Sequence, residues 1–444
     1  MSDETTFRPN SLDEYWMPFT PQRLFKKAPR MVTHAKGVYY YDEDGREILD
    51  GTAGLWCVNL GHDHPTIKQA MKDQIDTLDF GHSFQMGHPS AFHAASRLVD
   101  VMPDPIRHVF FSNSGSEAVD TALKIALAYW HAKGKPQRRV IIGRERGYHG
   151  VGFGGISVGG LSYNRKAFGG SLLPNVDHLP HTSNLEHNAF TKGQPEWGAH
   201  LADVLEQRIL TLHDPDNVAA VIVEPVAGST GVLPPPKGYL ERLRAICDKY
   251  GILLIFDEVI TAFGRFGHTS SSDYFGVKPD IICTAKGLTN GMVPMGATFV
   301  TGDIYDAFMH GPEIFTEFMH GYTYSGHPLA CAAALAVQDV IRDEHVYDHV
   351  HKMITPFEDA VHSLKGLPRI VDIRNSGLLG AVEFEKGPDD DPYKYPREVM
   401  IKSFYKGVIV RFTGNSMAIS PPVVATTAHL DQIIQTVRDV IHEL

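Results

Sequence analysis

The sequence predicts an α/β fold in which a mostly parallel sheet is covered by helices, and three observations carry this prediction. Apolar segments such as 219–223 and 252–256 lack polar alternation, which is typical of strands buried on both faces. Segments with helical periodicity alternate with these strands along the middle of the chain. Polar residues directly follow several strands, at the edge where such sheets bind ligands.

The expected elements can be placed in chain order. A hairpin over residues 38–49 turns at Glu43, Asp44 and Gly45. Strands are then expected at 108–111, 139–142, 219–223, 252–256, 280–283 and 297–300. Helices are expected at 117–130, where apolar residues recur at helical spacing, and at 239–250, which ends at Gly251. Helical segments after residue 328 precede strands at 370–373, 380–384 and 408–411 and a helix at 430–444.

The two ends differ from the middle, and we expect them to form a smaller α+β domain together. Residues 1–70 would contribute an N-terminal segment to this domain, and residues 328–444 would form the rest of it. Residues 71–327 would form the large domain. Residues 181–200 are polar and irregular, which is typical of a surface excursion.

Composition excludes several classes of protein. The 444 residues are 43 % hydrophobic and 21 % charged, as in an ordinary globular protein. A formal charge of −11 gives no basic surface for nucleic acid. No apolar stretch is long enough for a membrane span, and residues 1–10 lack the pattern of a signal peptide. The four cysteines form no C-x-x-C pair, so we expect reduced thiols in a cytoplasmic protein and no metal site.

Two polar residues at strand ends indicate the chemistry. Asp257 ends one buried strand, and Lys286 follows another. A lysine that loses its proton in a desolvated site can form a Schiff base with an aldehyde cofactor. A buried aspartate can hold a pyridine nitrogen protonated, which is what the electron sink of pyridoxal phosphate requires. On these two residues alone, a surface lysine and a helix-capping aspartate are equally compatible.

Three further motifs follow strands. Ser114, Gly115 and Ser116 precede a helix, where free N–H groups and the helix dipole favour a phosphate, although a plain N-cap would use the same residues. Tyr148 lies between glycines and can stack on a planar cofactor. Glu224 places a carboxylate after a buried strand, so it is either functional or exposed.

These residues, with three longer segments, resemble the class III aminotransferases, pyridoxal-phosphate enzymes of the aspartate-aminotransferase-like fold (fold type I). The segments are DGTAGLW at 50–56, FQMGHP at 84–89 and YTYSGHP at 322–328. The resemblance runs from Trp16 to Arg411 and is greatest to the ω-amino acid–pyruvate aminotransferases of the β-alanine–pyruvate type.

The resemblance implies a role for each residue. Lys286 is the Schiff-base lysine and the base that moves the proton, and Asp257 pairs with the pyridine nitrogen. The other cofactor-binding residues would be Ser114, Gly115, Ser116, Tyr148, Glu224, Val259 and, from the neighbouring subunit, Thr323. The substrate pocket would be lined by Phe19, Trp56, Phe84 (from this chain or its partner) and Arg411, which grips a carboxylate. The active unit would be a homodimer or homotetramer with shared sites.

Three positions depart from related subgroups. Members that act on ornithine or 4-aminobutyrate have a glutamate that neutralises the arginine, where this chain has Ser229. Ala227 stands where a glutamine often precedes glycine, and Ala418 where β-alanine-using relatives tend to have glutamine. We therefore expect an Arg411 free of a glutamate partner.

The expected reaction is transamination of an ω-amino acid or primary amine with pyruvate, giving an aldehyde or ketone and alanine. An aminomutase or a decarboxylating aminotransferase on the same fold is an alternative, because the cofactor performs the difficult step in each case. Ser157 lies in a G-x-S-x-G pattern and would be the nucleophile of a serine hydrolase, but no strand–turn–helix context surrounds it. The G-x-G-x-x-G pattern at 150–155 likewise lacks the strand and helix of a dinucleotide site.

Overall fold

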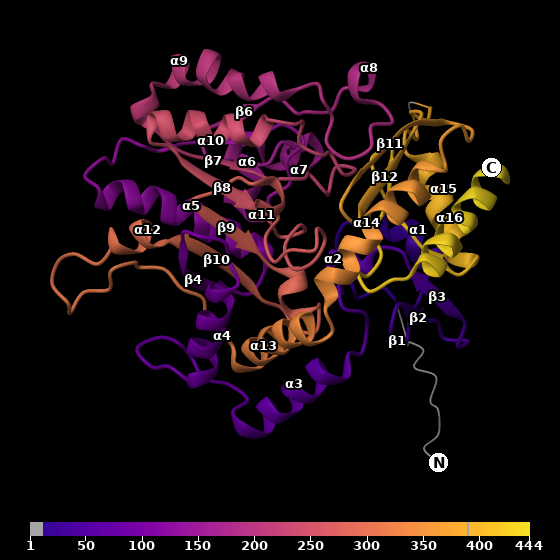
Figure 1. Ribbon diagram of the computed structural model, residues 1–444, viewed down its shortest axis with the longest axis horizontal. Helices are drawn as coiled ribbons and strands as arrows, with labels where there is room; N and C mark the ends of the chain where they lie inside the picture. Colours follow the sequence, from indigo (N-terminus) through magenta and orange to yellow (C-terminus); the bar gives the residue numbers. More distant parts are fainter. Residues whose placement is uncertain (1–11, 389) are drawn as a thin grey trace.

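The computed structural model describes residues 12–388 and 390–444. Figure 1 shows a large unit built around a central sheet, with a smaller unit beside it that contains β1, β2, β3 and the C-terminal helices. Within the described residues the central sheet has seven strands in the order β4-β10-β9-β8-β7-β5-β6. They are β4 (Ile106–Ser112), β5 (Val140–Arg144), β6 (Val176–Leu179), β7 (Val218–Val223), β8 (Leu253–Asp257), β9 (Ile281–Thr284) and β10 (Gly296–Thr301).

Strand direction in this sheet brings the predicted motifs together. The strands β9, β8, β7, β5 and β6 are parallel to one another. The strand β10 runs antiparallel to both β4 and β9, so β4 points the same way as β9. The residues that follow β4, β5, β7, β8 and β9 therefore lie along one edge of the sheet, as the sequence predicts.

Helices cover both faces of the sheet. Every residue of β7 and β8 is buried. Val221 packs in one cluster with Leu243 of α10 (Tyr239–Tyr250), whereas Ile222 packs in another with Ala122 of α5 (Gly115–Ala132). Successive strand residues point to opposite faces, so each strand contributes apolar side chains to two cores. Burying each Val, Leu or Ile side chain stabilises the fold by about 1.5–3 kcal/mol.

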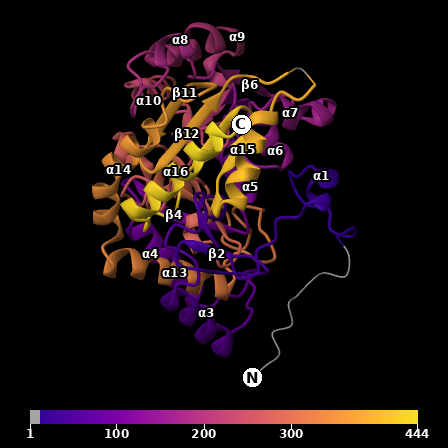
Figure 2. The ribbon, with the colours of Figure 1, turned by 90° about the vertical axis from the view of Figure 1, so that its right-hand side faces the viewer.

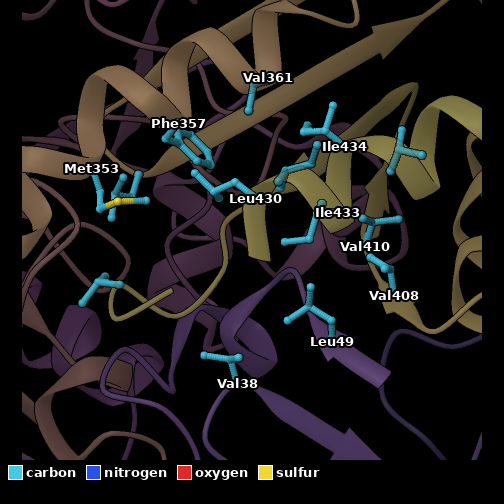
Figure 3. Packing of buried hydrophobic residues seen from close by; sticks show 14 of the residues in the cluster. Val38, Leu49, Met353, Phe357, Val361, Val408, Val410, Leu430, Ile433 and Ile434 are labelled. Atoms are coloured by element: carbon cyan, nitrogen blue, oxygen red, sulfur yellow. The ribbon is translucent and has the colours of Figure 1, made fainter. Parts of the chain in front are cut away.

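The two ends of the chain meet in the small unit. One sheet has the order β1-β2-β3-β13, in which β13 pairs in parallel with β3 through Val408 and Leu49. Figure 3 shows Leu49 near Val408, Val410 and Ile433, and Val38 belongs to the same hydrophobic cluster. In the turned view of Figure 2, the helices of the C-terminal segment lie beside β11 and β12. This shared sheet and core support the proposed small domain, while its boundaries at 70 and 328 stay a prediction.

The strands of the small unit are β1 (His34–Lys36), β2 (Tyr39–Tyr41), β3 (Glu47–Asp50), β11 (Ile370–Ser376), β12 (Leu379–Phe384), β13 (Val408–Ile409), β14 (Arg411–Thr413) and β15 (Ser416–Ile419). The other longer helices are α3 (Pro65–Thr77), α4 (Pro89–Asp100), α13 (Pro328–Asp343), α14 (Val346–His362), α15 (Lys394–Tyr405) and α16 (Thr427–His442). Short helices are α1 (Gln22–Lys27), α2 (Ala53–Trp56), α6 (Phe153–Val158), α7 (Ser162–Arg165), α8 (Leu185–Asn188), α9 (Leu210–His213), α11 (Ser271–Phe275) and α12 (Gly302–Asp306).

Two expectations need correction. The single strand predicted at 408–411 is divided, because β13 pairs with β3 while β14 pairs with β15 in the second small sheet, whose order is β11-β12-β15-β14. The G-x-G-x-x-G segment does open a helix, the six-residue α6.

No helix among the described residues is long and apolar enough to cross a membrane. The prediction about a signal peptide concerns residues 1–10, which lie outside the described residues.

Candidate active site

A cavity of about 150 Å³ lies at the edge where the carboxyl ends of the strands meet. Seven of the residues singled out from the sequence line it: Gly115, Ser116, Tyr148, Glu224, Asp257, Val259 and Lys286. His149, Gly150, Ile260 and Ala285 complete its wall. A larger cavity of about 550 Å³ lies between α4, β4 and α12, and none of the predicted site residues lines it.

Lys286 begins a 3-10 turn, η5 (Lys286–Thr289), directly after β9 and Ala285. No hydrogen bond or ion pair reaches its ammonium from any residue that the structure describes. The side chain is partly exposed to the cavity, but loss of hydration lowers the pKa of Lys286, and nearby acidic groups only partly oppose this effect. A lowered pKa favours the neutral amine, which is the nucleophilic form.

Asp257 is the last residue of β8 and is buried. One carboxylate oxygen, Oδ1, accepts a hydrogen bond from the N–H of Val259 at 3.1 Å. The other, Oδ2, lies 2.8 Å from Nδ1 of His149, whose Nε2 is buried without a partner. The sequence analysis did not identify His149 as a site residue. The only sequence signal for it was its place directly after Tyr148, inside the glycine-flanked segment. The histidine fixes the direction of the Asp257 carboxylate.

Glu224 follows β7 and is buried rather than exposed. Its Oε1 accepts a hydrogen bond from the N–H of Tyr148 at 2.9 Å, and its Oε2 accepts one from the N–H of Gly228 at 3.1 Å. Burial raises the pKa of Glu224 to about 7, with His149 acting in the opposite direction. The carboxyl group therefore ties the loop that carries Tyr148 to the loop after β7.

The N-terminus of α5 forms an anion cradle. The Ser114 hydroxyl caps the helix by accepting a hydrogen bond from the N–H of Glu117 at 3.2 Å. The N–H groups of Gly115 and Ser116, in the first turn, have no partner within the helix. A Cβ atom on Gly150 would lie 2.5 Å from the Ser116 hydroxyl, and one on Gly115 would lie 2.9 Å from Val259. Ser114 is thus a cap, and the glycines keep space open next to it.

Arg411 and Trp56 lie beside each other. The Arg411 guanidinium carbon is 5.2 Å from the centre of the Trp56 ring. Loss of hydration lowers the pKa of Arg411, and no ion pair reaches it from the described residues. Ala418 is its register partner on β15, and the Ser229 carbonyl accepts a hydrogen bond from the Thr413 hydroxyl at 2.6 Å. The guanidinium is therefore available to a substrate carboxylate.

Six predicted residues do not line the cavity. Three of them are Ser114, Trp56 and Arg411, and the other three are Phe19, Phe84 and Thr323. Phe19, Phe84 and Thr323 are exposed in the single chain. The segment that carries Thr323 is held in place two residues later, where the Ser325 hydroxyl donates a hydrogen bond to the Phe111 carbonyl at 2.8 Å. For Thr323 and Phe84 the expected role involves a second subunit, so all three assignments stay predictions.

Ser157 is held by structural hydrogen bonds. Its hydroxyl donates to the Phe153 carbonyl at 2.6 Å within α6 and accepts from the N–H of Leu173 at 2.8 Å. The side chain is fully buried. This arrangement does not support a serine nucleophile.

The donor set fits pyridoxal phosphate. An unpartnered amine at Lys286, a buried carboxylate at Asp257 and an anion cradle at Gly115 and Ser116 face one cavity. These are the groups required by an aldehyde, a pyridine nitrogen and a phosphate. Cβ atoms on Gly115 and Gly150 would collide with Val259 and Ser116, so the close packing of the segments around the start of α5 depends on both glycines.

Comparisons with known proteins agree with this reading of the cavity. The chain matches the family described as aminotransferase class-III over residues 23–441. It is 55 % identical to an omega-aminotransferase of Caulobacter vibrioides, over 99 % of each chain. It is 46 % identical to a beta-alanine–pyruvate aminotransferase of Pseudomonas aeruginosa, over 97 % of this chain and 96 % of the relative. A solved amine transaminase from an uncultivated Pseudomonas species, in a PLP-bound form, matches with a TM-score of 0.90 and 35 % identity, covering 98 % of this chain and 100 % of that one.

Proposed function

The chain belongs to the class-III aminotransferases, and from this premise we propose that it moves an amino group from an ω-amino acid or a primary amine to pyruvate. The products are an aldehyde or a ketone and alanine. The protein is an aminotransferase whose cofactor is pyridoxal 5′-phosphate. The observation that carries the proposal is the unpartnered Lys286 amine facing Asp257 and the α5 cradle in one cavity.

The assignment of residues to the cofactor follows from their chemistry. Lys286 would hold the aldehyde carbon, Asp257 the ring nitrogen, and Gly115 and Ser116 the phosphate. When bound, pyridoxal phosphate withdraws electrons from the carbon that carries the amino group and so stabilises the loss of its proton. Tyr148 and Val259 line the cavity and would contact the two ring faces.

Lys286 acts as the base. Its lowered pKa leaves a neutral Nζ at neutral pH more often than an exposed lysine would. With the cofactor bound, Nζ would accept the proton that leaves the amine-bearing carbon of the donor and would later release it. Asp257, held by His149 at 2.8 Å, would accept a hydrogen bond from the ring nitrogen of the bound cofactor.

Arg411 allows the same pocket to take two kinds of substrate. With no carboxylate of the described chain paired to it, its planar guanidinium can bind the carboxylate of pyruvate by two hydrogen bonds. An amine donor without a carboxylate leaves that guanidinium against the Trp56 ring, which stabilises a cation.

The assembly and the location are further parts of the proposal. We propose a homodimer or homotetramer in which Thr323 of one subunit reaches the phosphate of the other. The exposure of Thr323 and Phe84 supports it, because exposed side chains are accessible to a second subunit. A cytoplasmic location is supported by four free thiols, the state that a reducing compartment maintains.

The test is to incubate the purified enzyme with pyruvate and a donor panel of β-alanine, taurine, putrescine and simple aryl amines. We expect alanine and the matching aldehyde or ketone in equal amounts. Release of carbon dioxide or an isomerised donor, without alanine, would instead indicate a decarboxylase or an aminomutase.

A further inference from the structure

A second, polar cavity of about 320 Å³ lies beyond Arg411 and shares no lining residue with the cofactor cavity. Its wall carries hydroxyl groups, one amide and one arginine, from Arg146, Ser162, Tyr163, Thr230, Tyr393 and Asn415. We call it the Arg146 cavity. No residue singled out from the sequence lines it.

The Arg146 cavity adjoins the substrate side of the active site. Thr413, which lines it, is two residues after Arg411 on β14, so both side chains point to the same face of the strand. Tyr163 also lines it and lies within electrostatic reach of Arg411. The Arg146 cavity therefore lies on the face of β14 to which Arg411 points.

Two buried polar atoms of its wall have no partner. These are the Thr230 hydroxyl oxygen and the Asn415 side-chain oxygen. Buried polar groups in folded proteins are almost always hydrogen-bonded to protein, water or ligand. Two such groups at one cavity indicate a place where a polar molecule binds.

The charges of the wall favour an anion. Among the residues that the structure describes, Glu383 is the only carboxylate lining the cavity, and Arg374 already pairs with it and with Asp372. Arg146 has no ion pair with any residue in the described ranges. The free groups are therefore a guanidinium and several hydroxyl donors, which is the donor set that binds a carboxylate.

We propose that the Arg146 cavity binds the distal carboxylate of amino donors whose chain extends past Arg411. The inference rests on the proposed transaminase function, since it concerns the far end of the same substrate. Long-chain ω-amino acids are the class of donor that it selects, and short donors such as β-alanine do not reach it.

The test compares donors of one length with and without a terminal acid in the holoenzyme. The donors are 8-aminooctanoate, octylamine and β-alanine, each with pyruvate. The variant Arg146→Gln removes the charge and retains a side chain at a backbone position with φ of 60°. Arg139→Gln is the matched control, because Arg139 is exposed in a loop before β5 and lines neither cavity. Thr230→Val removes one buried hydroxyl and leaves a side chain of the same shape.

We expect Arg146→Gln to raise the KM for 8-aminooctanoate about tenfold, the effect of losing one charge-assisted hydrogen bond. Octylamine and β-alanine should keep their KM values, Thr230→Val should show a smaller rise with 8-aminooctanoate alone, and Arg139→Gln should behave as wild type. Equal KM values for 8-aminooctanoate in wild type and Arg146→Gln, or equal rises for 8-aminooctanoate and octylamine, would overturn the proposal.

Calorimetric titration with octanoate separates this inference from the function on which it rests. Octanoate has no amine and needs no turnover. Binding about tenfold weaker in Arg146→Gln than in Arg139→Gln would support the site even in a protein that makes no alanine. Binding that is equal in the two variants would show that water alone fills the cavity, whatever the transaminase activity.

Discussion

Burial gives the ionisable side chains around Lys286 different charges. The amine of Lys286 and the carboxyl of Glu224 are both desolvated, which lowers the pKa of the lysine and raises that of the glutamate. Asp257 is also buried, but His149 and the N–H of Val259 hold its two oxygens. These two contacts fix the direction in which the Asp257 carboxylate points.

Glu224 should make the stability of the protein depend on pH. The folded chain keeps this proton up to about pH 7, whereas an unfolded glutamate releases it near its ordinary pKa of 4.5. Below the lower value the contribution is complete, and it is lost as the pH rises through the higher one. Between about pH 5 and pH 8, wild type should lose up to about 3 kcal/mol more unfolding free energy than Glu224→Gln. Urea unfolding at both pH values measures the difference, and parallel losses would refute the assignment.

Arg411 should discriminate between substrates with and without a carboxylate. Arg411→Ala is expected to lower kcat/KM for pyruvate by about 10- to 100-fold, because a charge-assisted hydrogen bond is lost. The half-reaction with an amine that has no carboxylate should change much less. The two half-reactions can be followed separately by the absorbance of the bound cofactor. Equal losses in both would mean that Arg411 does not bind the carboxylate.

At the scale of elements, the parallel strands and the start of α5 create the site. The carboxyl ends of the parallel strands meet along one edge of the sheet. Residues far apart in sequence, such as Tyr148 and Lys286, therefore line one cavity. The cradle itself depends on close contact between the first turn of α5 and the 148–152 loop, where Gly150 approaches Ser116.

Gly150→Ala should weaken cofactor binding without unfolding the protein. The added methyl group would meet the Ser116 backbone at 2.7 Å, and the residue has a φ of +91° that favours glycine. Strain of this kind is worth about 1–3 kcal/mol, so the Kd for pyridoxal phosphate should rise about tenfold or more. Gly169→Ala is the control, since its Cβ would meet nothing within 4 Å. Fluorescence titration measures the Kd, and unchanged binding in Gly150→Ala would contradict the cradle.

The elements that the sequence predicts well are those with a strong local pattern. Strand β7 and helix α10 follow from an unbroken apolar run and from helical spacing that ends at Gly251. The division of β13 from β14 has no local signal, because it depends on pairing with β3 and β15, distant in sequence. His149 was missed for the same reason: its partner Asp257 is brought to it only by the fold.

At the scale of the whole molecule, one segment of the surface carries several large exposed apolar side chains. The segment 314–324 exposes Ile314, Phe315, Met319 and Tyr324. Figure 1 shows the chain between α12 and α13 extending away from the central sheet. Large exposed apolar side chains grouped in one segment are typical of an interface. Thr323 lies in this segment, which suits the proposed contact with a second subunit's phosphate.

Shared sites can be tested by mixing two inactive variants. Lys286→Ala removes the base, and Thr323→Asp should repel the phosphate of the neighbouring subunit. In a symmetric dimer each mixed pair has one intact site, so a reassociated equal mixture should regain roughly a quarter of wild-type activity. Each variant incubated alone is the control. A mixture as inactive as its components would show that Thr323 serves its own chain or none.

The central claim is that Lys286 is the residue covalently joined to the cofactor. Reducing the holoenzyme with borohydride and mapping the peptides by mass spectrometry tests it directly. We expect a pyridoxyl group on the peptide that contains Lys286, and none on that peptide from Lys286→Arg. A pyridoxyl group on another lysine, or no labelled peptide from a fully loaded enzyme, would contradict it.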